Sequence, residues 1–333
     1  MSQDQRREQL KHWLAGLFGV TSISVEPASS DASFRRYFRF SVDQQSYIVM
    51  DAPPEKENSE PFIRIGKRFY ELGLNVPKII DQDIDQGFLL LSDLGDNVYL
   101  SQLHTDTVER LYGDALGALA MLQAGTSIEE GFLPPYDAKL LNTEMELFRE
   151  WYLGRHLGVE LTSTQHQQLD DVFALLRESA LAQPQVWVHR DFHSRNLMVT
   201  PLNNPGVLDF QDAVLGPVTY DLVSLLRDCY IRWPRAQVIG WAEGYFRLAR
   251  QSGIPVGNDI EQFIAWFDRM GVQRHLKASG IFARLCHRDG KSGYLEDIPR
   301  TLGYVMDVCE QYDDLKPLAE LIDTLNIPYE PVE

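Results

Sequence analysis

Short strand-like runs of apolar residues, separated by polar loops, dominate the first third of the chain. They cover residues 21–27, 33–41, 46–52, 76–83 and 87–93. An amphipathic helix over 5–18 precedes them, with Leu10, Trp13, Leu14 and Leu17 on one face. A second helix is predicted over 60–73, with Gly73 as its C-cap. Strands with an inserted helix predict a small, β-rich N-terminal lobe.

The pattern changes after Gly95, where long stretches have helical periodicity. They cover 104–124, 137–157, 162–182, 219–231, 235–252, 259–288 and 314–325. Strand signals in this part are short and clustered, at 186–189, 196–200 and 206–210. The sequence therefore predicts an α+β protein with a β-rich lobe over 1–95, a hinge at about 89–95, and a mostly helical lobe over 96–333.

Three polar residues in one stretch predict a site for phosphoryl transfer. The stretch reads HRDFHSRNLMV from 189, then GVLDFQD from 206 and GPVTYDL from 216. Kinase chemistry needs a carboxylate to orient a hydroxyl and take its proton, and oxygen ligands for Mg²⁺. Asp191 is the candidate catalytic base, and Asn196 and Asp209 are the candidate metal ligands. We expect His189 to brace the loop that carries Asp191.

Composition limits the partners of such a protein. With 31 basic and 48 acidic residues among 333, the formal charge is −17, which argues against binding nucleic acid or an anionic membrane. No apolar run is long enough to cross a membrane, and the N-terminus does not read as a signal peptide. The three cysteines form no metal-ligand pattern and read as reduced thiols. We expect a cytoplasmic protein; the sequence does not indicate its oligomeric state.

The motif stretch resembles the aminoglycoside phosphotransferase and choline kinase superfamily, which shares the protein-kinase fold. The resemblance implies ATP and Mg²⁺ as cofactors. In that family a GP-x2-YDL segment follows the metal-binding Asp, and its own Asp supports the catalytic loop. This implies a supporting role for Asp221, which from the sequence alone reads equally well as an ordinary carboxylate at a helix N-terminus.

The resemblance also locates the ATP side. The family's phosphate-covering loop falls on SSDASFRRYF, which contains no glycine, and its candidate contacts are Ser29, Ser30, Ala32, Ser33, Arg35 and Arg36. The sequence is equally consistent with two arginines that lie on a strand, have their side chains in solvent and do not contact phosphate. The third strand has Met50 and Asp51 where most members have a phosphate-binding lysine. The hinge offers its backbone to adenine at Leu91, Ser92, Asp93 and Leu94.

A closer resemblance is to bacterial cell-wall amino-sugar kinases, carried by ASFRRYFRF, SYIVMDAPPE, GFLLLSDLG and the motif stretch. That group phosphorylates the anomeric hydroxyl of N-acetylmuramate and N-acetylglucosamine in peptidoglycan recycling. It shares the missing lysine and the MDAPPE run. The resemblance implies that the acceptor is the C1 hydroxyl of a free amino sugar.

Sugar-binding residues are expected on the 137–157 helix and within the motifs. The candidates are Glu144, Arg149, Trp151, Tyr152, His193, Arg195, Gln211 and Asp212. Trp151 could stack on a sugar ring or belong to the core, and Arg149 could bind a carboxylate or lie in solvent. Other functions remain open: a kinase for an aminoglycoside- or choline-like alcohol, a nucleotide-binding pseudokinase, and metal-dependent hydrolysis.

Overall fold

The computed structural model describes residues 3–30, 34–127 and 131–331. The chain packs into two compact units, Met1–Val98 with Leu197–Asp212, and Tyr99–Asn196 with Ala213–Glu333. The predicted boundary after Gly95 assigned residues 197–212 to the helical lobe. Their contacts lie with the N-terminal unit, so the chain passes from one unit to the other after Val98, after Asn196 and after Asp212.

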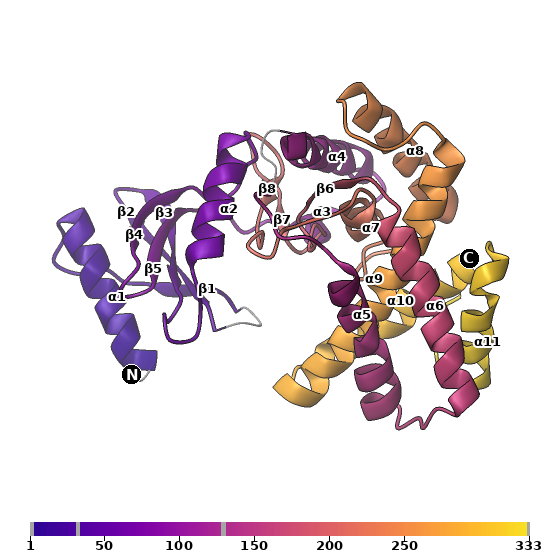
Figure 1. Ribbon diagram of the computed structural model, residues 1–333. Coiled ribbons are helices and arrows are strands. Elements are labelled where there is room, and N and C mark those ends of the chain that lie inside the picture. Colours follow the sequence, from indigo (N-terminus) through magenta and orange to yellow (C-terminus); the bar gives the residue numbers. More distant parts are fainter. Residues whose placement is uncertain (1–2, 31–33, 128–130, 332–333) are drawn as a thin grey trace. The chain divides into compact units, whose positions relative to one another are not determined.

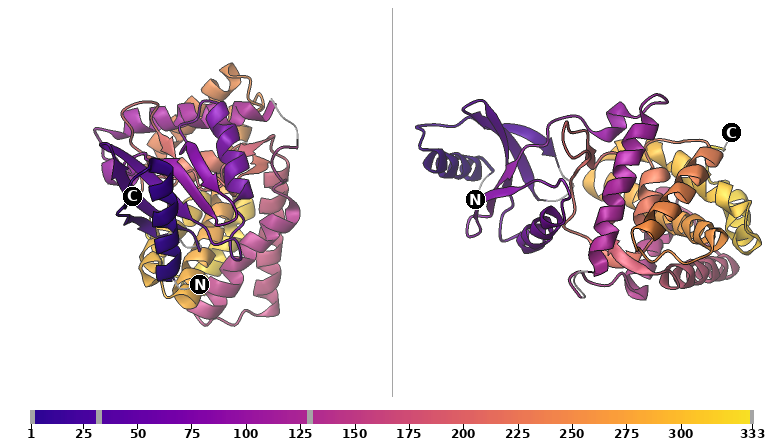
Figure 2. Two further views of the ribbon diagram at one scale, coloured as in Figure 1. Left: turned by 90° about the vertical axis from the view of Figure 1, so that its left-hand side faces the viewer. Right: turned by 90° about the horizontal axis from the view of Figure 1, so that it is seen from above.

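The N-terminal unit is built on a five-stranded antiparallel sheet with strand order β1-β2-β3-β5-β4. Its elements are α1 Gln3–Phe18, β1 Glu26–Ser30, β2 Arg36–Val42, β3 Gln45–Asp51, α2 Glu60–Glu71, β4 Ile79–Asp83 and β5 Phe88–Ser92. The sheet lies between α1 and α2 (Figures 1 and 2). The predicted strands and both predicted helices are present, with shifted ends.

Helix α1 covers one face of this sheet. Its buried Leu10 and Leu14 form a cluster with apolar residues that alternate along the strands, namely Phe38, Phe40, Val49, Phe88 and Leu90. The returning segment adds a short hairpin, β7 Leu197–Met198 with β8 Gly206–Val207. Backbone hydrogen bonds hold the hairpin to the unit, from Val199 to the Asn97 carbonyl at 2.7 Å and from Val207 to the Asn75 carbonyl at 2.8 Å.

The second unit is mainly helical, as predicted. Its helices are α3 Tyr99–Gln102, α4 Val108–Ala124, α5 Ala138–Leu147, α6 Ser163–Leu181, α7 Tyr220–Leu226, α8 Arg235–Gln251, α9 Ile260–Asp289, α10 Ile298–Cys309 and α11 Lys316–Thr324. Short 3₁₀ helices cover Gly125–Ser127, Ser292–Asp297 and Asp313–Leu315. One two-stranded sheet pairs β6 Gln185–Val188 with β9 Val214–Pro217. The helix predicted over 137–157 is present, as α5 followed directly by a π-helix over Phe148–His156.

Helix α9 runs through the core of this unit, and its burial depends on a close approach to α5. A Cβ atom on Gly280 would lie 2.2 Å from the carbonyl carbon of Leu147. Only glycine therefore fits where α9 passes the junction of α5 and the π-helix. This approach brings the polar residues of α9 toward those of α5.

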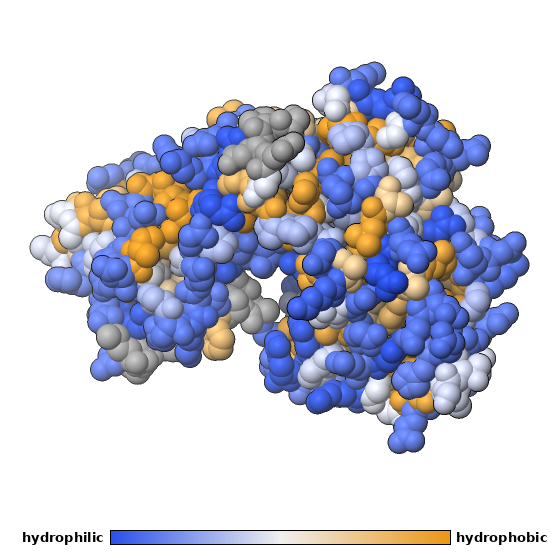
Figure 3. Space-filling view, in the orientation of Figure 1, coloured by the Kyte–Doolittle hydropathy of each residue, from blue (hydrophilic) through white to orange (hydrophobic). Residues whose placement is uncertain are grey.

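Hydrophilic residues cover much of the surface. The face seen in Figure 3 is mostly hydrophilic, with apolar residues in small patches. None of the helices within the described ranges is long and apolar enough to cross a membrane.

Candidate active site

The loop that follows β6 presents Asp191, and hydrogen bonds within it fix its shape. The Asp191 amide donates to Nδ1 of His189 at 3.2 Å. The His193 amide donates to the Asp191 carbonyl at 3.0 Å, and the Asn196 side-chain amide donates to the same oxygen at 3.0 Å. Three of the predicted site residues, together with His189, thus belong to one closed loop.

Asp221, at the start of α7, holds the beginning of this loop. Its two carboxylate oxygens accept the amides of His189 at 2.6 Å and Arg190 at 2.9 Å. Arg190 has a φ of 78°, a conformation that L-residues rarely adopt. The two hydrogen bonds stabilise this turn, so the contacts of Asp221 match the supporting role predicted for it.

The electrostatic surroundings keep Asp191 ionised. Burial raises the pKa of its carboxyl, but the cations Lys277 and Arg274, together with the neighbouring His193 imidazole, outweigh burial and hold the pKa below its ordinary value. A carboxylate in this state can accept a proton or a hydrogen bond from a hydroxyl at neutral pH.

Burial raises the pKa of Asp221 to about 7, and the hydrogen bonds from His189 and Arg190 oppose that rise only in part. Above this pH the carboxylate accepts hydrogen bonds from both backbone amides. Below it one oxygen carries a proton, and the hydrogen bond that this oxygen accepts is weakened. We therefore expect turnover to rise with pH through about 7, while Asp191 stays ionised throughout. A pH–rate profile from pH 5.5 to 9 measures this.

Asp221→Asn tests the origin of this pH dependence. The asparagine side chain has one acceptor oxygen, which can accept one of the two backbone N–H groups. Its NH₂ group then faces the other N–H, and two donors cannot form a hydrogen bond. We expect the variant to be slow and nearly independent of pH across the same range. An acid limb that persists unchanged in Asp221→Asn would contradict the assignment.

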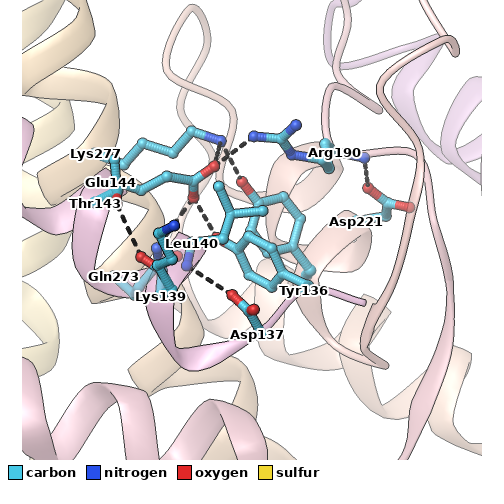
Figure 4. A network of polar contacts seen from close by, with 11 residues as sticks. Tyr136, Asp137, Lys139, Leu140, Thr143, Glu144, Arg190, Asp221, Gln273 and Lys277 are labelled. Atoms are coloured by element: carbon cyan, nitrogen blue, oxygen red, sulfur yellow. Dashed lines mark hydrogen bonds and ion pairs between the residues drawn. The ribbon is translucent and has the colours of Figure 1, made fainter. Parts of the chain in front are cut away.

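Glu144 on α5 organises the cations beside the loop (Figure 4). It is 4% exposed and pairs with Arg190 of the loop and with Lys277 of α9, the latter at 2.9 Å. The Tyr136 hydroxyl also donates to it. Burial raises the pKa of Glu144, but Lys277 and Arg190 outweigh burial and lower it. Glu144 was predicted to contact sugar, whereas its observed contacts position two cations near Asp191.

Aromatic rings lie on the other side of the loop. The His193 and Tyr230 rings are 5.5 Å apart, and the Arg195 guanidinium lies 4.6 Å from the centre of Tyr230 and 5.4 Å from that of Tyr294. Nδ1 of His193 has no hydrogen-bond partner among the described residues. This group of polar and aromatic side chains is a suitable lining for a sugar.

The other predicted sugar contacts on the 137–157 segment are engaged elsewhere. Arg149 pairs with Asp170 of α6 and lies 3.4 Å from Glu146. Trp151 packs against the helical core and lies under the Arg155 guanidinium at 4.4 Å. Tyr152 is buried in that core. None of these contacts joins them to the Asp191 loop, and their proposed role in sugar binding stays a prediction.

Asp209, the second predicted metal ligand, belongs to the N-terminal unit. It follows β8 in a left-handed conformation with φ of 65°. Nε2 of Gln211 donates to its carboxylate at 2.7 Å and lies 3.5 Å from that of Asp212. The next residue, Phe210, is anchored between Phe62 and Phe69, with ring centres 4.9 and 6.0 Å away. Packing of Phe210 thereby fixes the backbone that presents Asp209.

The predicted ATP contacts fall into two groups. Ser29 and Ser30 end β1, whereas Ala32 and Ser33 lie outside the described residues. At the hinge, Leu91 is buried in β5, and the Ser92 hydroxyl accepts the Lys78 amide at 2.8 Å. The carboxylate of Asp93, one residue before Leu94, forms an ion pair with Arg39 at 2.6 Å and accepts a hydrogen bond from the Ser46 hydroxyl at 2.5 Å. These bonds fix the hinge backbone that was predicted to pair with adenine.

The two arginines predicted for the phosphate side have carboxylate partners. Arg35 lies 3.4 Å from Glu57. Arg36 pairs directly across the strands with the fully buried Asp51, which also pairs with Arg6 of α1. Since Asp51 follows Met50 in a strand, the two side chains point to opposite faces, and Asp51 lies on the face covered by α1. The residue at the expected lysine position thus joins α1 to the sheet.

The donor chemistry of Asn196 and Asp209 fits Mg²⁺. A side-chain amide oxygen and a carboxylate are hard ligands, and Mg²⁺ usually binds one or two such protein groups plus phosphate oxygens and water. The nitrogen of Asn196 is engaged with the Asp191 carbonyl, which orients the amide. Within the described residues, no group of three or more His, Cys, Asp or Glu side chains could hold a metal ion.

Several site residues were not predicted from the sequence: Arg190, Tyr230, Arg274 and Lys277. Arg190 lies inside the HRD motif, which was an available signal. The two cations on α9 lie within a largely buried helix, where an isolated charge indicates a buried partner or a ligand.

Known proteins match this chain over most of its length. Residues 24–259 match the phosphotransferase enzyme family. The chain is 48% identical over 333 residues to the N-acetylmuramate/N-acetylglucosamine kinase of Pseudomonas putida, covering 97% of each chain. It is 45% identical over 335 residues to the protein of the same name from Pseudomonas aeruginosa, covering 98% of each.

Solved structures show the same fold at low sequence identity. The ADP-bound aminoglycoside phosphotransferase APH(2'')-Ib aligns with a TM-score of 0.56 and 15% identity, over 94% of this chain and 98% of that one. The predicted protein-kinase-like α+β class is confirmed.

Proposed function

Because the chain belongs to the phosphotransferase enzyme family, we propose that it uses ATP to phosphorylate an amino sugar, N-acetylmuramate, N-acetylglucosamine or both. The observation that carries this proposal is the 48% identity to the Pseudomonas putida kinase over 97% of both chains. We further propose that the acceptor is the anomeric hydroxyl, that the product is a sugar 1-phosphate, and that the reaction serves peptidoglycan recycling.

Asp191 is the proposed catalytic base. Its lowered pKa makes it a weak base, and an anomeric hydroxyl is more acidic than an ordinary alcohol, so the two suit each other. In this mechanism the carboxylate orients the hydroxyl for in-line attack and accepts its proton as the bond to phosphorus forms. Asp221 and His189 act through the loop, by holding Asp191 in place.

We propose Asn196 and Asp209 as the residues that hold the magnesium of MgATP. The metal would neutralise charge on the phosphates during transfer. Gln211, hydrogen-bonded to Asp209 at 2.7 Å, fixes the orientation of that carboxylate. On the ATP side, the backbone of Leu91, Ser92, Asp93 and Leu94 is proposed to pair with adenine, and Ser29 and Ser30 to lie near the phosphates.

The experiment that tests the proposal is a panel of acceptors with MgATP. We expect ADP formation with N-acetylmuramate or N-acetylglucosamine, and a ³¹P spectrum of a phosphate coupled to the anomeric proton. Turnover of choline or an aminoglycoside, without turnover of either sugar, would replace this function with the alternative kinase. ATP binding without any turnover would indicate a pseudokinase, and phosphate release without an acceptor would indicate hydrolysis.

A further inference from the structure

Among the described residues, one buried cation near the Asp191 loop forms no direct ion pair with a carboxylate. The arginine and lysine side chains classed as buried among the described residues are Arg6, Arg227, Arg274 and Lys277. The others are paired: Arg6 with Asp51, Arg227 with Asp268 and Lys277 with Glu144. Arg274 is 6% exposed and forms no ion pair with any carboxylate in the described ranges. A buried charge without a partner is costly to the folded protein.

The hydrogen bond that Arg274 donates joins it to a thiol and not to a carboxylate. Its Nη1 donates to Sγ of Cys229 at 3.6 Å. Burial raises the pKa of the Cys229 thiol, so the sulfur is neutral at physiological pH. A neutral thiol is a weak acceptor and supplies no negative charge. The charges of Asp228 and Asp191 act on the guanidinium without a direct ion pair, so its remaining N–H groups are still available to an anion that reaches it.

The position of Arg274 ties it to the Asp191 loop. Its contact residue, Cys229, follows Asp228, whose carboxylate accepts the amide of Ser194 at 2.8 Å. Tyr230, on the other side of Cys229, packs against the His193 ring at 5.5 Å. The segment that Arg274 contacts thus supports the loop three residues after Asp191. Its charge also acts on Asp191 itself.

Neighbouring cations are less suited to bind an additional anion. Arg190 and Lys277 share Glu144. Arg195 is exposed and stacks on Tyr230 and Tyr294. Arg274 is the one of these four that combines burial with an unpaired charge, within the part of the chain described.

We propose that Arg274 is a specificity-determining residue that binds the carboxylate of an acidic acceptor sugar. This inference rests on the proposed function. The two sugars named for the relatives differ in a lactyl ether, which gives N-acetylmuramate a carboxylate that N-acetylglucosamine lacks. A guanidinium binds a carboxylate through two parallel hydrogen bonds. N-acetylglucosamine occupies the same site with water in place of that group.

The test compares kcat/KM for the two sugars in Arg274→Gln and Arg274→Lys. We expect Arg274→Gln to lower kcat/KM for N-acetylmuramate about 100-fold and for N-acetylglucosamine less than about fivefold. Arg274→Lys keeps the charge without the fork geometry, and we expect a loss of about tenfold for N-acetylmuramate alone. Any change in the pKa of Asp191 affects both sugars, and it cancels in their ratio.

Arg284→Gln is the matched control, because Arg284 lies on the same helix, ten residues further along. We expect it to leave the ratio unchanged. Equal losses for both sugars in Arg274→Gln, or in Arg274→Lys if the glutamine variant does not fold, would overturn the inference and leave the proposed function intact. If the wild type turns over neither sugar, the proposed function and the inference fail together.

Discussion

Replacing Asp191 by asparagine is expected to lower kcat by about 1,000-fold, the scale typical of losing a general base. The asparagine keeps the size of the side chain and the backbone hydrogen bonds of the loop, which use the Asp191 amide and carbonyl. It loses the negative charge that accepts the hydroxyl proton. A coupled ADP assay measures kcat, and calorimetry with a non-hydrolysable ATP analogue measures nucleotide affinity, which we expect to change little.

The matched control is Asp171→Asn, on the exposed face of α6, where the carboxylate accepts only the Gln167 side chain at 2.9 Å. We expect wild-type kinetics for this variant. A rate for Asp191→Asn within about tenfold of the wild type would show that another group takes the proton.

Local sequence patterns predicted most elements of this fold, because strand runs and helical periodicity are short-range properties. They missed β9 Val214–Pro217, which lies between two motif segments and reads as loop, and α10 Ile298–Cys309. The π-helix over Phe148–His156 was also not predicted, because it continues directly from α5 and the whole 137–157 stretch was assigned to one helical pattern.

The candidate site was predictable where its residues share a motif, and not where they are far apart in sequence. Asp191, Asn196 and Asp209 were predicted from their spacing, and Asp221 from the family resemblance; the loop brings Asp191 and Asn196 together. Lys277 and Arg274 come from a helix about eighty residues later, and only the folded chain brings them to the loop. Similarly, the pairing of Asp51 with Arg6 joins strand and helix across 45 positions, which no local pattern reports.

The largest loss of stability is expected from Glu144→Gln. This change leaves Arg190 and Lys277 buried beside a neutral amide, and breaking a buried ion pair from one side costs about 3–5 kcal/mol of unfolding free energy. Glutamine has nearly the same volume and can still accept the Tyr136 hydroxyl, so the loss reports the charge. Urea unfolding followed by tryptophan fluorescence measures the free energy.

Two further variants separate charge from packing. Glu146→Gln, two residues along the same helix, removes a carboxylate that is more exposed and lies 3.4 Å from Arg149, and we expect a loss of at most about 1 kcal/mol. Adding Lys277→Met to Glu144→Gln removes one of the two unpaired cations, and we expect it to restore part of the lost stability. If Glu144→Gln costs no more than Glu146→Gln, the cations do not depend on Glu144, and their position beside Asp191 has another cause.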